Sequence, residues 1–104
     1  MPPKGGIIFI CMIKVIKCIN TQFPKRMDKI CSSIIGRTAA WYKNELNRDD
    51  IVFIEKNTID DYDWLRLNEV NSFPTILFFK DGELKYSRAH VMAQKQIMEV
   101  IEKL

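Results

Sequence analysis

The sequence predicts an α/β domain in which a central four-stranded mixed sheet lies between helices. Three observations predict this class: an apolar run near the N-terminus without alternation, helical spacing of the apolar residues that follow, and an Asp-Gly turn between two short strands. A chain of 104 residues is long enough for one domain and too short for two. We therefore expect residues 1–104 to form a single domain.

Strands and helices are expected in the order β-α-β-α-β-β-α. The run 7–16 (IIFICMIKVI) is rich in β-branched residues and predicts a strand covered on both faces. Apolar residues then recur every three or four positions, which predicts a long amphipathic helix from near Asn20 to near Asn47. A second strand at 51–56 and a brief helix beginning at Asp60 follow.

The C-terminal third predicts a hairpin and a last helix. Strands at 75–80 and 83–88 flank the Asp81-Gly82 dipeptide, which is typical of tight hairpin turns. An amphipathic helix is expected over 91–104. We expect the four strands to share one sheet.

Composition excludes several classes of protein. With 47% hydrophobic residues, 28% charged residues and only 4 Gly and 4 Pro, the chain is neither disordered nor collagen-like. A net charge of +3 without a basic stripe argues against a nucleic-acid partner. The apolar run at 7–13 is shorter than the roughly 20 residues of a membrane span, so no membrane association is expected, although a targeting segment is an alternative interpretation. An odd cysteine count, three, favours a reducing, cytoplasmic location.

Residues 51–104 resemble the C-terminal half of thioredoxin. The most specific part of the match is Phe73-Pro74-Thr75, directly before the segment ILFFKDGE. The resemblance implies a thioredoxin-like fold, with the strand at 75–80 antiparallel to the first two. It also implies a cis peptide bond before Pro74 and a binding role for Phe73, Pro74 and Thr75, whereas the residues alone favour an ordinary trans turn.

The N-terminal half resembles the family less. Thioredoxins carry Trp-Cys-Gly-Pro-Cys between the strand and the long helix, and the corresponding junction is predicted here at Lys17-Cys18-Ile19-Asn20-Thr21. Thr21 then replaces the second cysteine. An alternative alignment places the active-site cysteine at Cys31, within Cys-Ser-Ser-Ile. Both alignments lack Cys-x-x-Cys.

The resemblance to thioredoxin suggests thiol chemistry at Cys18. Only a thiolate attacks a disulfide, and a helix N-terminus with nearby cations lowers the pKa of a thiol. The resemblance also places His90 on the rim beside Cys18, where an imidazolium would favour the thiolate. Because Thr21 cannot resolve a mixed disulfide, we expect a weak monothiol thiol-disulfide oxidoreductase with Cys18, Thr21 and His90 at its catalytic site.

A second function is equally open from the sequence. A non-catalytic thioredoxin-fold module would hold an extended protein segment in the groove beside Pro74. Under that interpretation Cys18 is a packing residue and His90 an ordinary loop residue. In either case the expected partner is a protein, as a thiol, a disulfide or an extended segment. No cofactor is expected, and no metal either, because a zinc site needs about four Cys or His ligands and the sequence has one histidine.

Overall fold

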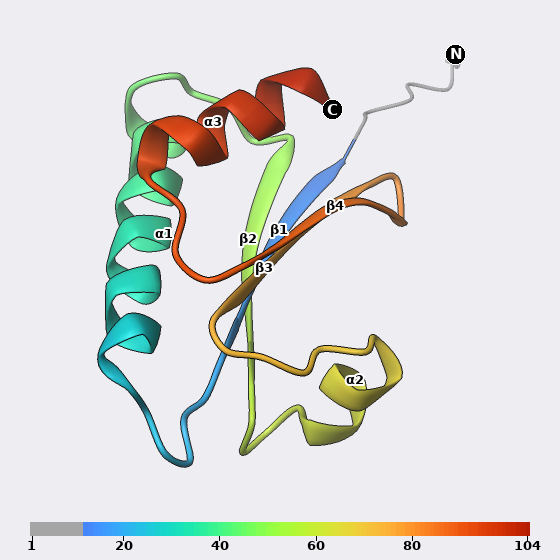
Figure 1. Ribbon diagram of the computed structural model, residues 1–104. Helices are drawn as coiled ribbons and strands as arrows, with labels where there is room; N and C mark the ends of the chain where they lie inside the picture. The colour runs from blue at the N-terminus through green and yellow to red at the C-terminus, as the bar shows by residue number, and fades with distance from the viewer. Residues whose placement is uncertain (1–11) are drawn as a thin grey trace.

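The protein is represented by a computed structural model, of which residues 12–104 are described. Its sheet has the strand order β2-β1-β3-β4, with α1 and α3 on one face and α2 on the other (Figure 1). The elements are β1 (Ile13–Ile19), α1 (Arg26–Asn44), β2 (Ile51–Asn57), α2 (Tyr62–Leu67), β3 (Thr75–Lys80), β4 (Glu83–Ala89) and α3 (Gln94–Lys103). The predicted fold class and element order are confirmed.

The pairing of the strands also agrees with the prediction. β1 is central, parallel to β2 and antiparallel to β3, and β4 returns antiparallel to β3. The hairpin turns at Asp81 and Gly82, whose φ angles of 52° and 84° are both positive. Positive φ at both central residues matches the right-handed twist of the strands, which is why Asp-Gly is favoured there.

The first strand is displaced from its predicted position. It was expected at 7–16, and in the structure it runs from Ile13 to Ile19, while residues 7–11 lie outside the described part of the chain. The strand therefore continues three residues beyond its predicted end and takes in Cys18. The apolar run correctly predicted a strand. The lysine-containing residues that follow this run also pair with the neighbouring strands.

The long helix begins at Arg26 instead of near Asn20. Pro24 disfavours helical backbone at the residue before it, which excludes an earlier start. The carboxylate of Asp28 accepts a hydrogen bond from the backbone N–H of Lys25 at 2.9 Å, and so satisfies one of the free donors at the helix N-terminus.

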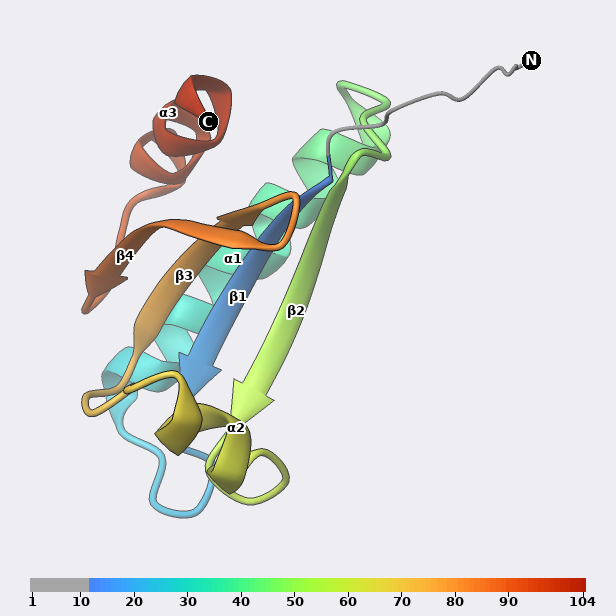
Figure 2. The ribbon, with the colours of Figure 1, turned by 90° about the vertical axis from the view of Figure 1, so that its right-hand side faces the viewer.

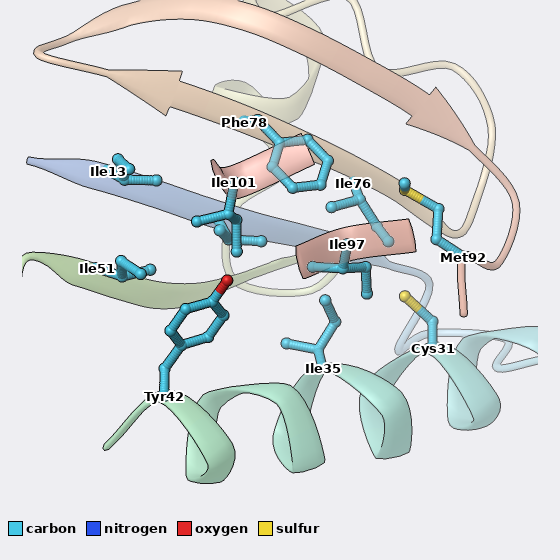
Figure 3. Close-up of a cluster of buried hydrophobic side chains, with 11 residues drawn as sticks. Ile13, Cys31, Ile35, Tyr42, Ile51, Ile76, Phe78, Met92, Ile97 and Ile101 are labelled. Atoms are coloured by element: carbon cyan, nitrogen blue, oxygen red, sulfur yellow. The ribbon is translucent and has the colours of Figure 1, made fainter. Parts of the chain in front are cut away.

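Two apolar cores flank the sheet. The larger lies beneath α1 and α3 and includes Cys31, Tyr42 and Met92 (Figure 3). The smaller lies beneath α2 and includes Cys18 and Leu65. Because β1 faces both cores, five of its seven side chains are buried, and these five are its apolar residues.

Candidate functional site

Three loops meet at the C-terminal ends of β1 and β2. They are residues 20–25 between β1 and α1, residues 58–61 between β2 and α2, and residues 71–74 before β3. Figure 2 shows the first two at the same end of the sheet, below the arrowheads of β1 and β2. The third reaches this end because Thr75 pairs with Cys18 in the antiparallel ladder.

Cys18 lies inside β1 and is 0% exposed. Burial raises the pKa of its thiol to about 12, with further increases from Cys31 and Asp61 and an opposing effect of Lys56. The prediction that Cys18 stands at the start of the long helix is therefore wrong. The helix begins eight positions later in the sequence, at Arg26, so its N-terminal dipole does not act on this thiol as predicted.

Cys31, the alternative candidate, is also buried. It lies on the inward face of α1 and points towards Met92 in the larger core (Figure 3). Burial raises the pKa of its thiol to about 11, while Lys17 lowers it and Asp28 raises it further. Since Cys18 and Cys31 belong to the cores on opposite faces of the sheet, residues 12–104 offer neither an exposed thiol nor a pair of thiols in contact.

The position between the strand and the long helix holds no cysteine. It reads Asn-Thr-Gln-Phe-Pro-Lys, residues 20–25. Every backbone N–H of this loop donates to a side-chain oxygen, at N–O distances of 2.9 to 3.1 Å: Asn20 and Lys25 to Asp28, Thr21 and Gln22 to Thr58, and Phe23 to Asn20. Pro24 has no N–H to satisfy. Side-chain hydrogen bonds therefore fix the conformation of this loop, although it is neither helix nor strand.

Asn57 is the centre of a second set of hydrogen bonds. Its Oδ1 accepts bonds from the hydroxyl of Thr21 at 3.0 Å and from the backbone N–H groups of Ile59 and Asp60. Its Nδ2 donates to the carboxylates of Glu55 and Asp60. Asn57 thus joins the end of β2 to both adjacent loops. Thr21, predicted as a catalytic position, has a structural role in this network.

The loop before β3 contains the predicted binding residues. The Phe73–Pro74 peptide bond is cis, as the resemblance implies. Pro74 and Thr75 are buried, and the Thr75 hydroxyl donates to the carbonyl of Ser72 at 2.7 Å. Phe73 is partly exposed, and within residues 12–104 its backbone N–H and C=O take part in no hydrogen bond. Of the three predicted binding residues, Phe73 is the one available to a partner.

His90 lies near Pro74 but is not paired with Cys18. Its backbone N–H donates to the Pro74 carbonyl at 2.8 Å, and its side chain is exposed. The titratable groups that shift the pKa of the Cys18 thiol are Cys31, Asp61 and Lys56. The predicted Cys18–His90 pair is therefore not formed, because the thiol faces a core and His90 stands outside it.

Exposed apolar side chains gather where the active-site motif was expected. Phe23 is 72% exposed at the tip of the fixed loop. Ile59 and Tyr62, each 63% exposed, follow Thr58, which binds the same loop. Met27, in the first turn of α1, is also exposed. We call Phe23, Met27, Ile59 and Tyr62 the apolar tip.

Two further properties concern the described residues only. No group of three or more His, Cys, Asp or Glu side chains that could hold a metal ion occurs in residues 12–104. None of the helices in this part of the chain is long and apolar enough to cross a membrane.

Comparison with solved structures defines the class of fold. The chain is similar to thioredoxin-2 of a malaria parasite, a component of the parasite's protein secretion machinery, with a TM-score of 0.78, 15% identity, and coverage of 96% of this chain and 90% of that chain. It is similar to the germline-specific thioredoxin Deadhead of Drosophila melanogaster, with a TM-score of 0.72, 17% identity, and coverage of 89% and 81%.

A third similar chain comes from a structural study of thiol resolution in yeast mitochondrial 1-Cys peroxiredoxin through the glutathione and thioredoxin systems. Its TM-score is 0.72 at 19% identity, with coverage of 89% of this chain and 79% of that chain. No family model and no curated protein matches the sequence. The protein has a thioredoxin-like fold.

The residues that shape this site were not predicted from the sequence. Asn57 ends a strand, Thr58 directly follows it, and Asp28 stands three residues after the helix N-cap, where short polar side chains commonly bind free backbone groups. Those signals were present. Phe23 gave none, because a phenylalanine beside a proline is not distinguished from a core residue until its exposure is known.

Proposed function

We propose that this protein is a non-catalytic, thioredoxin-fold binding module that holds an extended protein segment at the apolar tip and the Phe73 backbone. The single observation that carries the proposal is an exposed phenylalanine on a loop that contains no cysteine and whose backbone is fixed by hydrogen bonds. Phe23 is 72% exposed, although each N–H around it is fixed by a side-chain oxygen. An apolar side chain that a rigid loop keeps exposed to solvent is typical of a protein-binding anchor.

The backbone of Phe73 complements this anchor. Its N–H and C=O groups are free within the described residues, so an extended segment can pair with them as one strand pairs with another. Because the loop of residues 20–25 is already ordered, binding a partner costs little conformational entropy in this loop.

The monothiol reaction, the other function that the sequence allowed, has no support in this geometry. Attack on a disulfide requires a thiolate that the disulfide can reach. Cys18 is 0% exposed and burial raises the pKa of its thiol to about 12. Neither condition is met at neutral pH.

A binding measurement with a defined extended polypeptide tests the proposal. The probe is reduced and alkylated insulin B chain, whose blocked cysteines exclude thiol exchange, labelled for fluorescence anisotropy. We expect the wild-type protein to bind it and Phe23→Ser to weaken binding at least tenfold, about 1.4 kcal/mol. Leu84→Ser is the matched control, since Leu84 is an exposed apolar residue on β4, away from the apolar tip.

Two results would contradict the proposal. One is equal weakening by Phe23→Ser and Leu84→Ser, which would indicate non-specific apolar binding. The other is catalysis of insulin reduction by dithiothreitol that is lost in Cys18→Ala, which would restore the monothiol function.

A further inference from the structure

We propose that two copies of this chain form a symmetric dimer through the outer edge of β2, joined antiparallel and packed through their α1 helices. β2 is the last strand of the sheet, and no strand within residues 12–104 pairs with its outer edge. The surface is separate from the apolar tip, so the dimer does not depend on the proposed binding function.

The two edges of the sheet differ in their protection against pairing. β4, the opposite edge, is exposed along its whole length and carries Glu83, Lys85 and Arg88. Its pairing with β3 is irregular between Phe78 and Phe79 of β3. Charges and bulges of this kind prevent association of edge strands. β2 has a regular register and begins with Ile-Val-Phe-Ile, residues 51–54. The charges of β2, Glu55 and Lys56, lie only in its second half, and its register has no bulge, so β2 is less protected than β4.

Hydrogen bonds to β1 show which residues of β2 direct their backbone outwards. The N–H of Ile13 donates to the carbonyl of Asp50, and the N–H of Thr58 donates to the carbonyl of Ile19. In a parallel ladder, alternate residues of a strand face the same neighbour. The even-numbered residues of β2 therefore bond to β1, and the odd-numbered residues present free groups at the edge.

One antiparallel register uses all the available outward groups. Ile51, Phe53 and Glu55 face outwards, whereas the N–H of Asn57 already donates to Asp61 at 3.0 Å. Placing Phe53 opposite Phe53 of a second copy sets Ile51 opposite Glu55. Each of these residues then exchanges hydrogen bonds with its counterpart, giving about six new bonds.

The same two-fold axis brings the α1 helices to packing distance. α1 contacts both β1 and β2, so its axis runs above the space between them. Neighbouring strands are about 4.8 Å apart, so the two-fold axis between the two β2 strands lies about one strand spacing from the α1 helix axis, measured across the sheet. The two α1 axes are then about 10 Å apart, which is within the usual range for packed helices of about 8 to 10 Å.

Small residues of α1 face this contact. A hollow beside the outer edge of β2 is lined by Gly36, Ala39 and Phe53, and the next hollow along the edge by Ala39, Val52 and Phe53. Ala39 therefore stands beside Phe53, close to the two-fold axis. A Cβ atom at Gly36 would meet nothing within 4 Å. A second α1 helix would fill these hollows.

The occupant that fits is a second copy rather than a separate peptide strand. A lone strand would use the β2 edge but leave Gly36 and Ala39 uncovered, whereas a second copy brings its own α1 to them. The antiparallel arrangement also places Asp50, which precedes one β2, directly opposite Lys56 near the end of the other. Opposite charges at these positions favour this orientation.

Sedimentation velocity of the wild-type protein and two arginine variants tests the dimer. We expect the wild type to dimerise between low micromolar and millimolar concentration, and Gly36→Arg to raise the dissociation constant at least about 100-fold, because the side chain enters the α1–α1 contact. Replacing Gly by Arg within a helix improves helix propensity, so the variant keeps its fold. Ala40→Arg is the control: Ala40 lines a different hollow, with Arg37 and Trp41, and its variant should dimerise normally.

Disulfide trapping provides a second measurement. In a Cys11→Ser background, Ala39→Cys should cross-link two copies on mild oxidation, because helix axes about 10 Å apart bring the Cα atoms to about 5 to 6 Å, a separation that a disulfide spans. Ala40→Cys should not cross-link. A wild type that is monomeric over the whole range, a dimer unaffected by Gly36→Arg, or equal cross-linking at positions 39 and 40 would overturn the proposal.

Discussion

The hydroxyl oxygen of Thr58 lies 3.0 Å from the backbone nitrogen of Thr21 and accepts its hydrogen bond. These residues are 37 positions apart in the sequence and belong to the loops that follow β1 and β2. The same oxygen accepts the N–H of Gln22 at 3.1 Å, and the hydroxyl donates to Asn20 Oδ1 at 3.0 Å. One threonine thus determines the shape of the loop that presents Phe23.

Thr58→Val should loosen this loop. Valine keeps the shape of threonine but leaves two N–H groups without an acceptor and removes one of the two hydrogen bonds to Asn20 Oδ1, so we expect a loss of about 1 to 3 kcal/mol. Amide hydrogen exchange at Thr21 and Gln22 should accelerate more than exchange in β1. Thr58→Ser, which keeps the hydroxyl, should retain most of the protection, and similar exchange in both variants would show that the hydroxyl is not what holds the loop.

Asn57→Ala should be among the more damaging polar substitutions. Asn57 is buried and accepts or donates five side-chain hydrogen bonds that join β2 to its neighbouring loops. Its removal leaves buried polar groups unpaired, so we expect a loss of about 2 to 3 kcal/mol in the free energy of unfolding, measured with urea. Asn68→Ala is the control, because Asn68 is exposed and its side chain makes one hydrogen bond, to the Trp64 carbonyl. Comparable losses in both variants would contradict the central role of Asn57.

Stability should fall in alkaline solution because of the two buried thiols. Burial raises the pKa of Cys18 from 9.0 to about 12 and that of Cys31 from 9.0 to about 11. Above about pH 9 the unfolded thiols lose their protons while the folded ones keep them, so the unfolded state binds fewer protons and is favoured. Below pH 9 this effect is absent.

Urea unfolding at pH 7, 9 and 10.5 measures this loss, which should be on the order of 2 kcal/mol per thiol at the highest pH. Other groups also titrate in this range, so the control is the double variant Cys18→Ala, Cys31→Ala, whose stability should depend less on pH. In the same protein, iodoacetamide at neutral pH should modify Cys18 far more slowly than in the urea-unfolded chain. An equal pH dependence of the double variant, or rapid native alkylation, would contradict the burial of these thiols.

Tyr42→Phe should weaken the attachment of α3 to α1. The hydroxyl of Tyr42 donates to Glu102 Oε2 at 2.8 Å, and the side chain is almost fully buried. Burial, together with this bond to Glu102, raises the pKa of the tyrosine hydroxyl. We expect a loss of about 1 to 2 kcal/mol in the free energy of unfolding, since the bond has a charged acceptor. Tyr62→Phe, an exposed tyrosine on α2, should change stability little, and a smaller loss at Tyr42 than at Tyr62 would refute this role.

The sequence alone determined the order of strands and helices. Periodicity separates the apolar run of β1 from the amphipathic stripe of α1, and both signals are local to the chain. Asp81 and Gly82 fix the β3–β4 hairpin because their preferred backbone conformations match it. The predicted α/β class needed no information about distant contacts.

Only the tertiary structure decided where the cysteines and Phe23 lie. Cys18 follows a lysine at the end of an apolar run, which is compatible with a helix start or with a strand interior. Its place in β1 depends on pairing with Lys56 in β2 and Thr75 in β3, partners far away in the sequence. Phe23 is exposed because Asp28 and Thr58 satisfy the backbone of its loop from two other elements. Burial and exposure arise from such long-range contacts, and so the chemistry of the site could not be read from local pattern.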